Sequence, residues 1–277
     1  MNDAATVEAW SGKGRHDENF PVASWLIRPD LRAHVHTFYT FARNADDIAD
    51  SPTLAPEDKL ARLDVMEAVL LGHANEGSPS ALALRESLAQ TAVTPVHATE
   101  LLIAFRRDAT KQRYATLTEL YDYCRYSAFP VGRHVLDLHK EGHRTYAPSD
   151  ALCGALQVLN HLQDCVKDLN ALDRCYLPEE LMASFGSSIA DLRRPSMTPG
   201  MRKVFGSILH RVERMTRFAS DLPRRVEDRR LRLETATIVS LAKRLAARLE
   251  HGDPLAARVK LSKADFALSA LLSLRFL

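Results

Sequence analysis

The sequence predicts an all-α fold in a single domain. Over long stretches, apolar residues recur every three or four positions, which is the period of an α-helix. Glycine is scarce, at 11 of 277 residues, and no alternating segments bounded by tight turns indicate strands. Apolar residues make up 46% of the chain, enough to bury a substantial core.

Two apolar stripes predict the first two helices. They comprise Leu31, Val35, Phe38, Phe41, Ala45 and Ile48, then Leu60, Leu63, Met66 and Leu70. Gly72 is a plausible stop for the second of these helices. Thr94-Pro95 and Thr198-Pro199 each predict an N-cap followed by proline at the first helical position. A third stripe, which includes Val204, Ile208, Val212 and Met215, follows the second of these caps.

Short breaks that contain proline or glycine separate the predicted helices. They lie at 51–52, 76–79, 146–148 and 194–195, and none is long or polar enough for an interdomain linker. We therefore expect a flexible N-terminal arm at 1–18 and one helical domain at 19–277.

Composition and charge exclude several classes of protein. The formal net charge of +2 lacks the basic surplus of a nucleic-acid binder. The four cysteines form no CxxC pair, which is typical of reduced thiols in a cytoplasmic protein. No stretch reaches the roughly 18 apolar residues that a membrane span needs, and no secretion signal is evident.

The segment Leu261–Leu277, rich in Ala and Leu, is open to two interpretations: core packing, or peripheral contact with the inner face of the cytoplasmic membrane. The arginine-rich stretch between Arg193 and Arg248 is either a solvated helix surface or a contact for anionic lipid or diphosphate.

Three carboxylates stand at the end of the first predicted helix. Asp46 and Asp50 are four apart and share one helix face, with Asp47 beside them. Like charges near a helix C-terminus destabilise it, and a neighbouring cation relieves that penalty. Mg²⁺ suits this role because it binds carboxylates together with substrate phosphates. Arg43, one turn before Asp47, is placed to pair with it or with a phosphate oxygen, and Tyr39 lies a turn further back.

A second polar line follows one face of a later apolar helix. Gln157, Asn160, Asp164 and Asp168 are spaced by three, four and four residues. Burying such a line is costly unless its groups find partners or ligands. A solvated face with incidental acids is the alternative, but the first acidic helix favours a site with two acidic walls.

Small residues interrupt an apolar helical run at 121–133, between the two acidic helices. Pro130 should kink or break the helix there, and Gly132 permits close approach of another helix or a ligand. This segment alone fits a packing kink equally well.

These elements together resemble the squalene/phytoene synthase family of isoprenoid enzymes, in the family's order, from about Asn19 to Pro178. The matching elements are Asn19–Ser24, the first acidic motif, Arg113-Tyr114, Tyr123-Cys124, Val131-Gly132, the second polar line and Arg174–Pro178. The resemblance implies an isoprenoid-synthase helical bundle around a central cavity. It also implies Mg²⁺ ions that grip the diphosphate of a prenyl substrate.

The resemblance implies roles for particular residues. Metal ligands would be Asp46, Asp47, Asp50, Asp164 and Asp168. Catalytic residues would be Tyr39, Arg43, Tyr123, Asn160 and Tyr176. Substrate-binding residues would be Phe20, Arg43, Lys111, Arg113, Ser127, Val131, Gly132, Arg133, Gln157 and Asn160.

Within the family, the sequence is most similar to the bacterial hydroxysqualene synthases of hopanoid biosynthesis. Gln163 and Lys167 stand where two-step squalene and phytoene synthases usually have Arg and an acidic residue. The resemblance implies an Mg²⁺-dependent enzyme that converts presqualene diphosphate and water to hydroxysqualene, without NADPH. The alternatives are a head-to-head prenyl transferase and a non-catalytic assembly or helper protein with the same fold. Oligomeric state and pathway enzyme partners stay open.

Overall fold

The computed structural model describes residues 6–8 and 26–277, and it confirms the all-helical single-domain prediction. Within this part of the chain, β-structure is limited to one isolated bridge between Arg113 and Cys175. The helices in order are α1 (Arg32–Ala49), α2 (Pro56–Leu70), α3 (Pro79–Thr91), α4 (Val96–Thr110), α5 (Leu117–Ser127), α6 (Phe129–Leu138), η1 (His143–Thr145), α7 (Tyr146–Leu172), α8 (Glu179–Ser184), η2 (Ile189–Arg193), α9 (Pro199–Ala219), α10 (Leu222–Arg225), α11 (Arg229–His251), α12 (Lys263–Ser273) and η3 (Leu274–Phe276).

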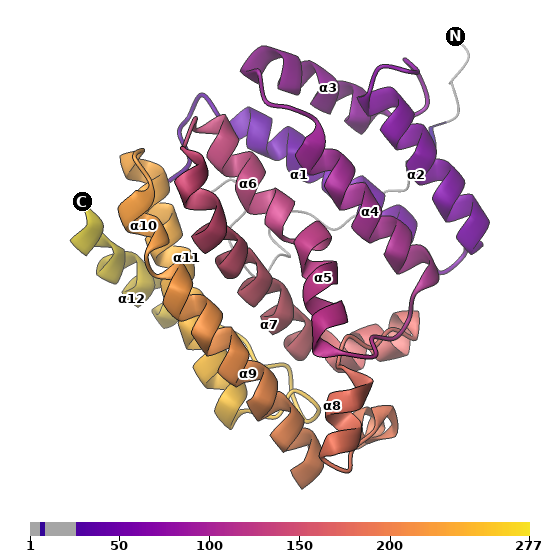
Figure 1. Cartoon of the computed structure of the whole chain (residues 1–277), viewed down its shortest axis with the longest axis vertical. Coiled ribbons are helices and arrows are strands. Elements are labelled where there is room, and N and C mark those ends of the chain that lie inside the picture. Colours follow the sequence, from indigo (N-terminus) through magenta and orange to yellow (C-terminus); the bar gives the residue numbers. More distant parts are fainter. Residues whose placement is uncertain (1–5, 9–25) are drawn as a thin grey trace.

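The 27-residue α7 is the central helix of the bundle. It packs against α6 and α5 on one side and against α9 and α11 on the other (Figure 1). The first four helices form a second group, in which α1 contacts α2, α3 and α4. Because α4 also contacts α5 and α6, one continuous apolar core joins the two groups.

The predicted helix starts and stops are largely confirmed. Thr198 caps α9 by accepting a hydrogen bond from the backbone of Met201 at 3.1 Å, with Pro199 first in the helix. Gly72 follows α2 with a φ of +81°, where glycine avoids strain. At α4 the prediction is one residue early, because the helix starts at Val96 and Pro95 is the N-cap. Pro95 already has near-helical angles, so the difference is one of terminal assignment.

The helix break predicted at Pro130 is also confirmed. Helix α5 ends at Ser127, Ala128 is non-helical, and α6 starts at Phe129 with proline in its first turn. Just beyond it, a Cβ on Gly132 would lie 2.5 Å from Ser149 Oγ and 2.6 Å from Cys153 Sγ. The glycine therefore lets α6 lie directly against α7.

Two loops, one after α4 and one after α7, pack against each other. The loop after α7 runs along the loop after α4, and the backbone of Cys175 donates to Gln112 O at 2.9 Å. Glu179 likewise donates to Tyr114 O at 2.9 Å. This pairing fixes the segment that follows the second polar line against α4 and α5. No helix in the described residues is both long and apolar enough to cross a bilayer.

Candidate active site

The first acidic motif lies at the C-terminal end of α1, as expected. Arg43 donates to Asp47 Oδ1 at 2.6 Å and lies 3.0 Å from Asp46 Oδ2. Asp47 is buried, while the Asp46 side chain keeps 32% of its surface exposed. Burial, with the carboxylate of Asp50 next in effect, raises the pKa of Asp46 well above its usual range. The Arg43 guanidinium offsets only part of this crowding.

Arg174 joins this motif to the segment after α7. Its Nη1 donates to Asp50 Oδ1 at 2.8 Å, and its Nη2 donates to the backbone oxygen of Asp108 at 2.8 Å. The Arg174 side chain is only 5% exposed, so its charge is held inside the protein by these partners. A buried guanidinium needs such pairing because desolvation is costly.

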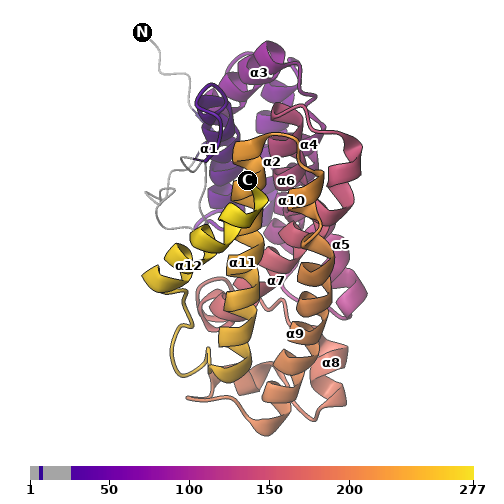
Figure 2. The same cartoon turned by 90° about the vertical axis from the view of Figure 1, so that its left-hand side faces the viewer.

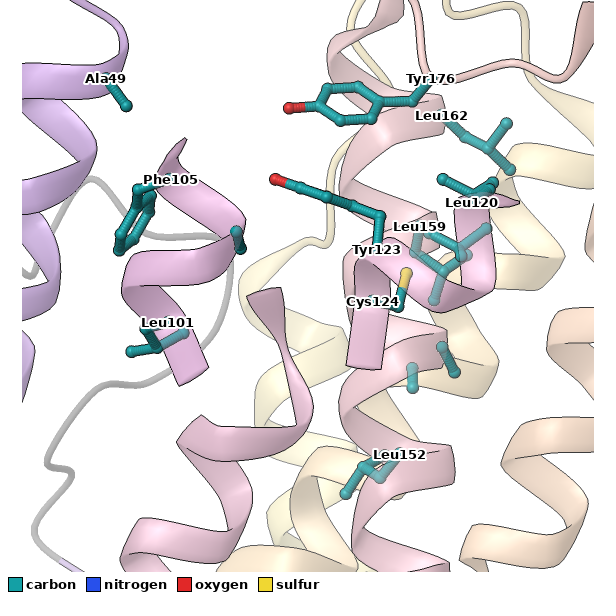
Figure 3. Packing of buried hydrophobic residues seen from close by; sticks show 14 of the residues in the cluster. Ala49, Leu101, Phe105, Leu120, Tyr123, Cys124, Leu152, Leu159, Leu162 and Tyr176 are labelled. Carbon is teal, nitrogen blue, oxygen red and sulfur yellow. The ribbon is translucent and has the colours of Figure 1, made fainter. Parts of the chain in front are cut away.

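Asp108 of α4 holds two tyrosine hydroxyls. Tyr123 donates to Asp108 Oδ2 at 2.7 Å, and Tyr176 donates to Oδ1 at 3.2 Å. Figure 3 shows both hydroxyl ends pointing toward the side where Ala49 and Phe105 lie. Burial raises the pKa of Asp108 to about 6, with Arg174 and the tyrosine hydroxyls opposing the rise. Burial also raises the pKa of both tyrosines, so they remain neutral hydroxyl donors.

An aromatic cluster surrounds these hydroxyls. His161 of α7 stacks on Tyr176 with 3.6 Å between ring centroids. Tyr114 stacks on the same ring at 5.3 Å, and Tyr123 lies 5.4 Å from it. Burial, with the Arg174 charge nearby, lowers the pKa of His161 to about 3, so this ring is uncharged at neutral pH. These rings are therefore uncharged, and the Arg174 guanidinium already lies 5.9 Å from the centroid of the Tyr176 ring.

The second acidic wall lies on α7. Asp164 Oδ1 is 3.0 Å from Arg258 Nη2, which comes from the loop between α11 and α12. Burial raises the pKa of Asp168 to about 7, with the carboxylates of Asp164 and Asp50 adding to the effect. The carboxylate of Asp50 in the first motif therefore contributes to the raised pKa of Asp168 in the second.

Gln163 and Lys167, the two departures from the two-step pattern, have different surroundings. Gln163 is buried and donates to Val259 O at 2.6 Å, which fastens the α11–α12 loop to α7. Lys167 is exposed, although its charge lowers the pKa of Asp168. The guanidinium beside Asp164 comes from Arg258 of the α11–α12 loop.

The donor set matches the chemistry of a hard divalent cation. Carboxylates outnumber the guanidiniums facing them, and their mutual repulsion is one cause of the raised pKa of Asp46 and of Asp168. Oxygen ligands of this kind suit Mg²⁺. Among the described residues, no three His, Cys, Asp or Glu side chains are gathered closely enough to hold a metal by themselves.

Other residues predicted to bind substrate are held by ion pairs outside the two acidic motifs. Lys111 pairs with Glu119, and Arg113 with Asp173 at 2.7 Å, both in the paired loops. Arg133 donates to Asp150 at 2.6 Å. Asp150 precedes Asp164 by 14 residues on α7, which is roughly 21 Å along the helix axis.

The remaining predicted residues are spread over α1, α5, α6, α7 and the N-terminal segment. Ser127 Oγ is buried at the end of α5, and Val131 on α6 is exposed, next to the Gly132 contact. Tyr39 on α1 and Gln157 and Asn160 on α7 are partly buried. Phe20 lies outside the described residues.

The structure adds to the site four residues that were not predicted from the sequence: Asp108, His161, Arg174 and Arg258. The sequence did contain an indication for Asp108, because it is a lone acid on the apolar side of α4. Arg174 sits directly after the second motif, within the segment that carried the family resemblance. Nothing in the sequence pattern connects Arg258 to Asp164, which is 94 positions away.

Comparison with known proteins gives consistent matches. The family model described as squalene/phytoene synthase matches residues 13–265. The hydroxysqualene synthase of Rhodopseudomonas palustris is 44% identical over 95% of this chain and 90% of its own. That of Sinorhizobium fredii is 46% identical over 91% and 86%. A crystal structure of squalene synthase HpnC from Alicyclobacillus acidocaldarius has a TM-score of 0.75 at 32% identity, covering 85% of this chain and 89% of its own.

Proposed function

Because the chain belongs to the squalene/phytoene synthase family, we propose that it catalyses the reaction of its hydroxysqualene synthase relatives. In this reaction presqualene diphosphate loses diphosphate, the cyclopropylcarbinyl cation rearranges, and water quenches the product cation to give hydroxysqualene. The observation that carries the proposal is the similarity to named hydroxysqualene synthases at 44–46% identity over nearly the whole chain.

The two acidic walls would hold the Mg²⁺ ions that this chemistry needs. Asp46 and Asp50 on one side and Asp164 and Asp168 on the other would be the ligands, supported by Asp47. Bound there, Mg²⁺ would act as a Lewis acid that makes diphosphate a better leaving group. Burial, together with the nearby carboxylate of Asp164, raises the pKa of Asp168, and this supports the assignment because a bound cation would stabilise the charged form.

Two arginine side chains would contact the diphosphate. Arg43 and Arg258 each pair with an acid of one motif, at 3.0 Å from Asp46 and from Asp164. A guanidinium recognises phosphate oxygens through two parallel hydrogen bonds. Arg174 acts differently, because its buried charge balances Asp50 and keeps the first wall in place.

The aromatic cluster would receive the carbocation. The buried rings of Tyr123 and Tyr176 would stabilise this cation, because cation–π attraction is worth ~0.5–2 kcal/mol per contact. Asp108 fixes both hydroxyls, so the rings are held before substrate arrives. The low pKa of His161 keeps this ring from adding a second positive charge beside Arg174.

One assay separates the proposed reaction from its rivals. Purified protein with Mg²⁺ receives presqualene diphosphate or farnesyl diphosphate, each with and without NADPH, and the C30 products are identified. Hydroxysqualene from presqualene diphosphate without NADPH is the expected result. Consumption of farnesyl diphosphate while presqualene diphosphate stays untouched would refute the proposed reaction and favour a head-to-head synthase. The A. acidocaldarius protein is named a squalene synthase.

The acidic motifs test the non-catalytic alternative. Asp46→Asn and Asp164→Asn should each abolish hydroxysqualene formation while the protein remains folded. Full complementation of a hopanoid-deficient strain by both variants would instead indicate a helper protein.

The proposed location is the cytoplasm with peripheral contact at the inner face of the membrane, since the product is an apolar alcohol.

A further inference from the structure

Helix α12 buries its polar side and exposes its apolar side. Asp265, Ser269 and Ser273, spaced by four residues, are only 7%, 0% and 4% exposed. The outer side carries large apolar residues that are 37–63% exposed: Phe266, Leu268, Leu271, Leu272 and Leu274 (the last begins η3). A helix at a water-facing surface has the opposite arrangement.

The inner side of α12 is fixed by specific contacts. The Asp265 carboxylate accepts from the backbone of Ser262 at 2.7 Å, which closes a capping box at the helix start. The same carboxylate lies 2.7 Å from Arg248 Nη2 on α11. Figure 2 shows α12 lying against α11 at the margin of the molecule. The outward apolar face is therefore set by the fold.

A cavity of about 340 Å³ adjoins this face, between α11 and the α12–η3 segment. Its apolar walls include Val239, Leu272 and Phe276, and cationic side chains of Lys243 and Arg275 line it as well. Within residues 6–8 and 26–277, neither of these two cations forms an ion pair. Burial, together with the charges of Arg275 and Arg217, lowers the pKa of Lys243. The cations crowd one another, so the cavity suits an anion.

We propose that the exposed face of α12 and this cavity bind an anionic phospholipid bilayer. The leucines and Phe266 would enter the boundary between head groups and acyl chains, and Lys243 and Arg275 would contact lipid phosphate. A bilayer supplies hydrocarbon and phosphate side by side, as this surface requires. A second copy of the chain would have to present its own acids to the cations. The proposal assigns residues to the membrane contact proposed above, and it does not depend on the proposed reaction.

Vesicle co-sedimentation of the full chain tests the proposal. Vesicles are made of phosphatidylcholine alone or with about a third phosphatidylglycerol. We expect the wild type to bind the anionic vesicles. The double variant Leu271→Ser/Leu274→Ser should partition at least tenfold less. The double variant Lys243→Gln/Arg275→Gln should lose about fivefold per charge on anionic vesicles only.

Matched substitutions elsewhere on the surface serve as controls. Leu71→Ser, at a position 41% exposed after α2, and Lys203→Gln on α9 should bind like the wild type. Thermal melts confirm that each variant is folded. If Leu271→Ser/Leu274→Ser is unfolded, the binding of Lys243→Gln/Arg275→Gln decides the outcome.

Two outcomes would overturn the proposal. One is equal sedimentation of wild type and both double variants, including no binding by any of them. The other is a wild-type dimer in sedimentation velocity that Leu271→Ser/Leu274→Ser dissociates, which assigns the face to a second copy. The vesicles contain no substrate, so either failure leaves the proposed reaction untouched.

Discussion

The guanidinium of Arg174 lies 2.8 Å from the carboxylate of Asp50, joining the first acidic motif to the segment after the second. The same guanidinium bonds the backbone oxygen of Asp108, whose carboxylate holds Tyr123 and Tyr176. One buried charge thus connects the first acidic motif to the aromatic cluster. The diphosphate end and the cation end of the proposed site are therefore parts of one network.

Removing the Arg174 charge should destabilise the protein strongly. Arg174→Met leaves Asp50 and Asp108 without their shared cation, and breaking a buried ion pair from one side costs about 3–5 kcal/mol. Urea unfolding of wild type and variant measures the difference. Arg144→Met, which breaks an exposed pair with Glu227, is the control and should cost less than about 1 kcal/mol. Equal effects of the two substitutions would contradict the network.

The pH dependence of stability should change when Asp168 is neutralised. Its pKa in the folded protein is about 7, above the usual 3.8, so the folded state retains a proton that the unfolded chain releases. This residue therefore lowers the free energy of unfolding as pH rises from about 4 to about 7, by on the order of 3 kcal/mol. In metal-free buffer, the stability of Asp168→Asn relative to wild type should increase over that range. A constant difference from pH 4 to pH 8 contradicts the expectation.

Mg²⁺ added with inorganic diphosphate should stabilise the wild type most at the upper end of this pH range. Ligands that bind only the folded state raise the melting temperature, and deprotonated Asp168 is the form that binds metal. Asp168→Asn should show a smaller rise. An equal rise in both proteins would remove Asp168 from the metal ligands.

His134 should have the opposite pH effect. It stacks on Phe38 at 3.8 Å with both ring nitrogens buried and unpartnered, and burial, with His97 nearby, lowers its pKa to about 3. Below the ordinary pKa of 6.5, the unfolded chain takes up a proton that the folded protein excludes. The wild type should therefore gain about 2 kcal/mol through this residue between pH 5 and 7.5. His134→Leu should remove that gain, whereas the exposed control His73→Leu should leave it; urea titrations at the two pH values measure it.

The sequence predicted those parts of the site that depend on one helix. Asp46 and Asp50, or Asp164 and Asp168, are one turn apart, so helical period alone brings each pair together. The break at Pro130 and the cap at Thr198 are likewise local effects of proline and hydroxyl chemistry. Such features need no knowledge of how helices pack.

Contacts between residues of different helices could not be predicted from the helical period. Asp50 and Arg174 are 124 positions apart, and Asp164 and Arg258 are 94 apart, so their pairing depends on tertiary packing. The Leu261–Leu277 segment shows the same limit. Its composition allowed either core packing or an interfacial helix, and only the position of α11 decides that Ser269 faces inward while Leu271 faces out.

Arg258 should act on substrate binding more than on stability. Arg258→Gln removes a charge-assisted contact worth about 1.5–3 kcal/mol, which corresponds to roughly a ten- to hundredfold loss in kcat/KM for presqualene diphosphate. Arg133→Gln is the matched control, because Arg133 is held by Asp150 far along α7, and it should lose much less. Steady-state kinetics of both variants decides. Equal losses would place the diphosphate nearer to Asp150 than proposed.

Gly132 and Gly206 should respond oppositely to the same methyl group. At Gly132 an added Cβ meets Ser149 Oγ and Cys153 Sγ inside 3 Å, so Gly132→Ala must displace these side chains or the helices that carry them, at a cost of about 1–3 kcal/mol. At Gly206, within α9, nothing lies within 4 Å of the added Cβ, and alanine should stabilise the helix by about 0.5–1 kcal/mol. Urea unfolding of the two variants measures both effects. If Gly132→Ala is as stable as the wild type, the close contact of α6 with α7 is wrong, and with it the packing that orients the second acidic wall on α7.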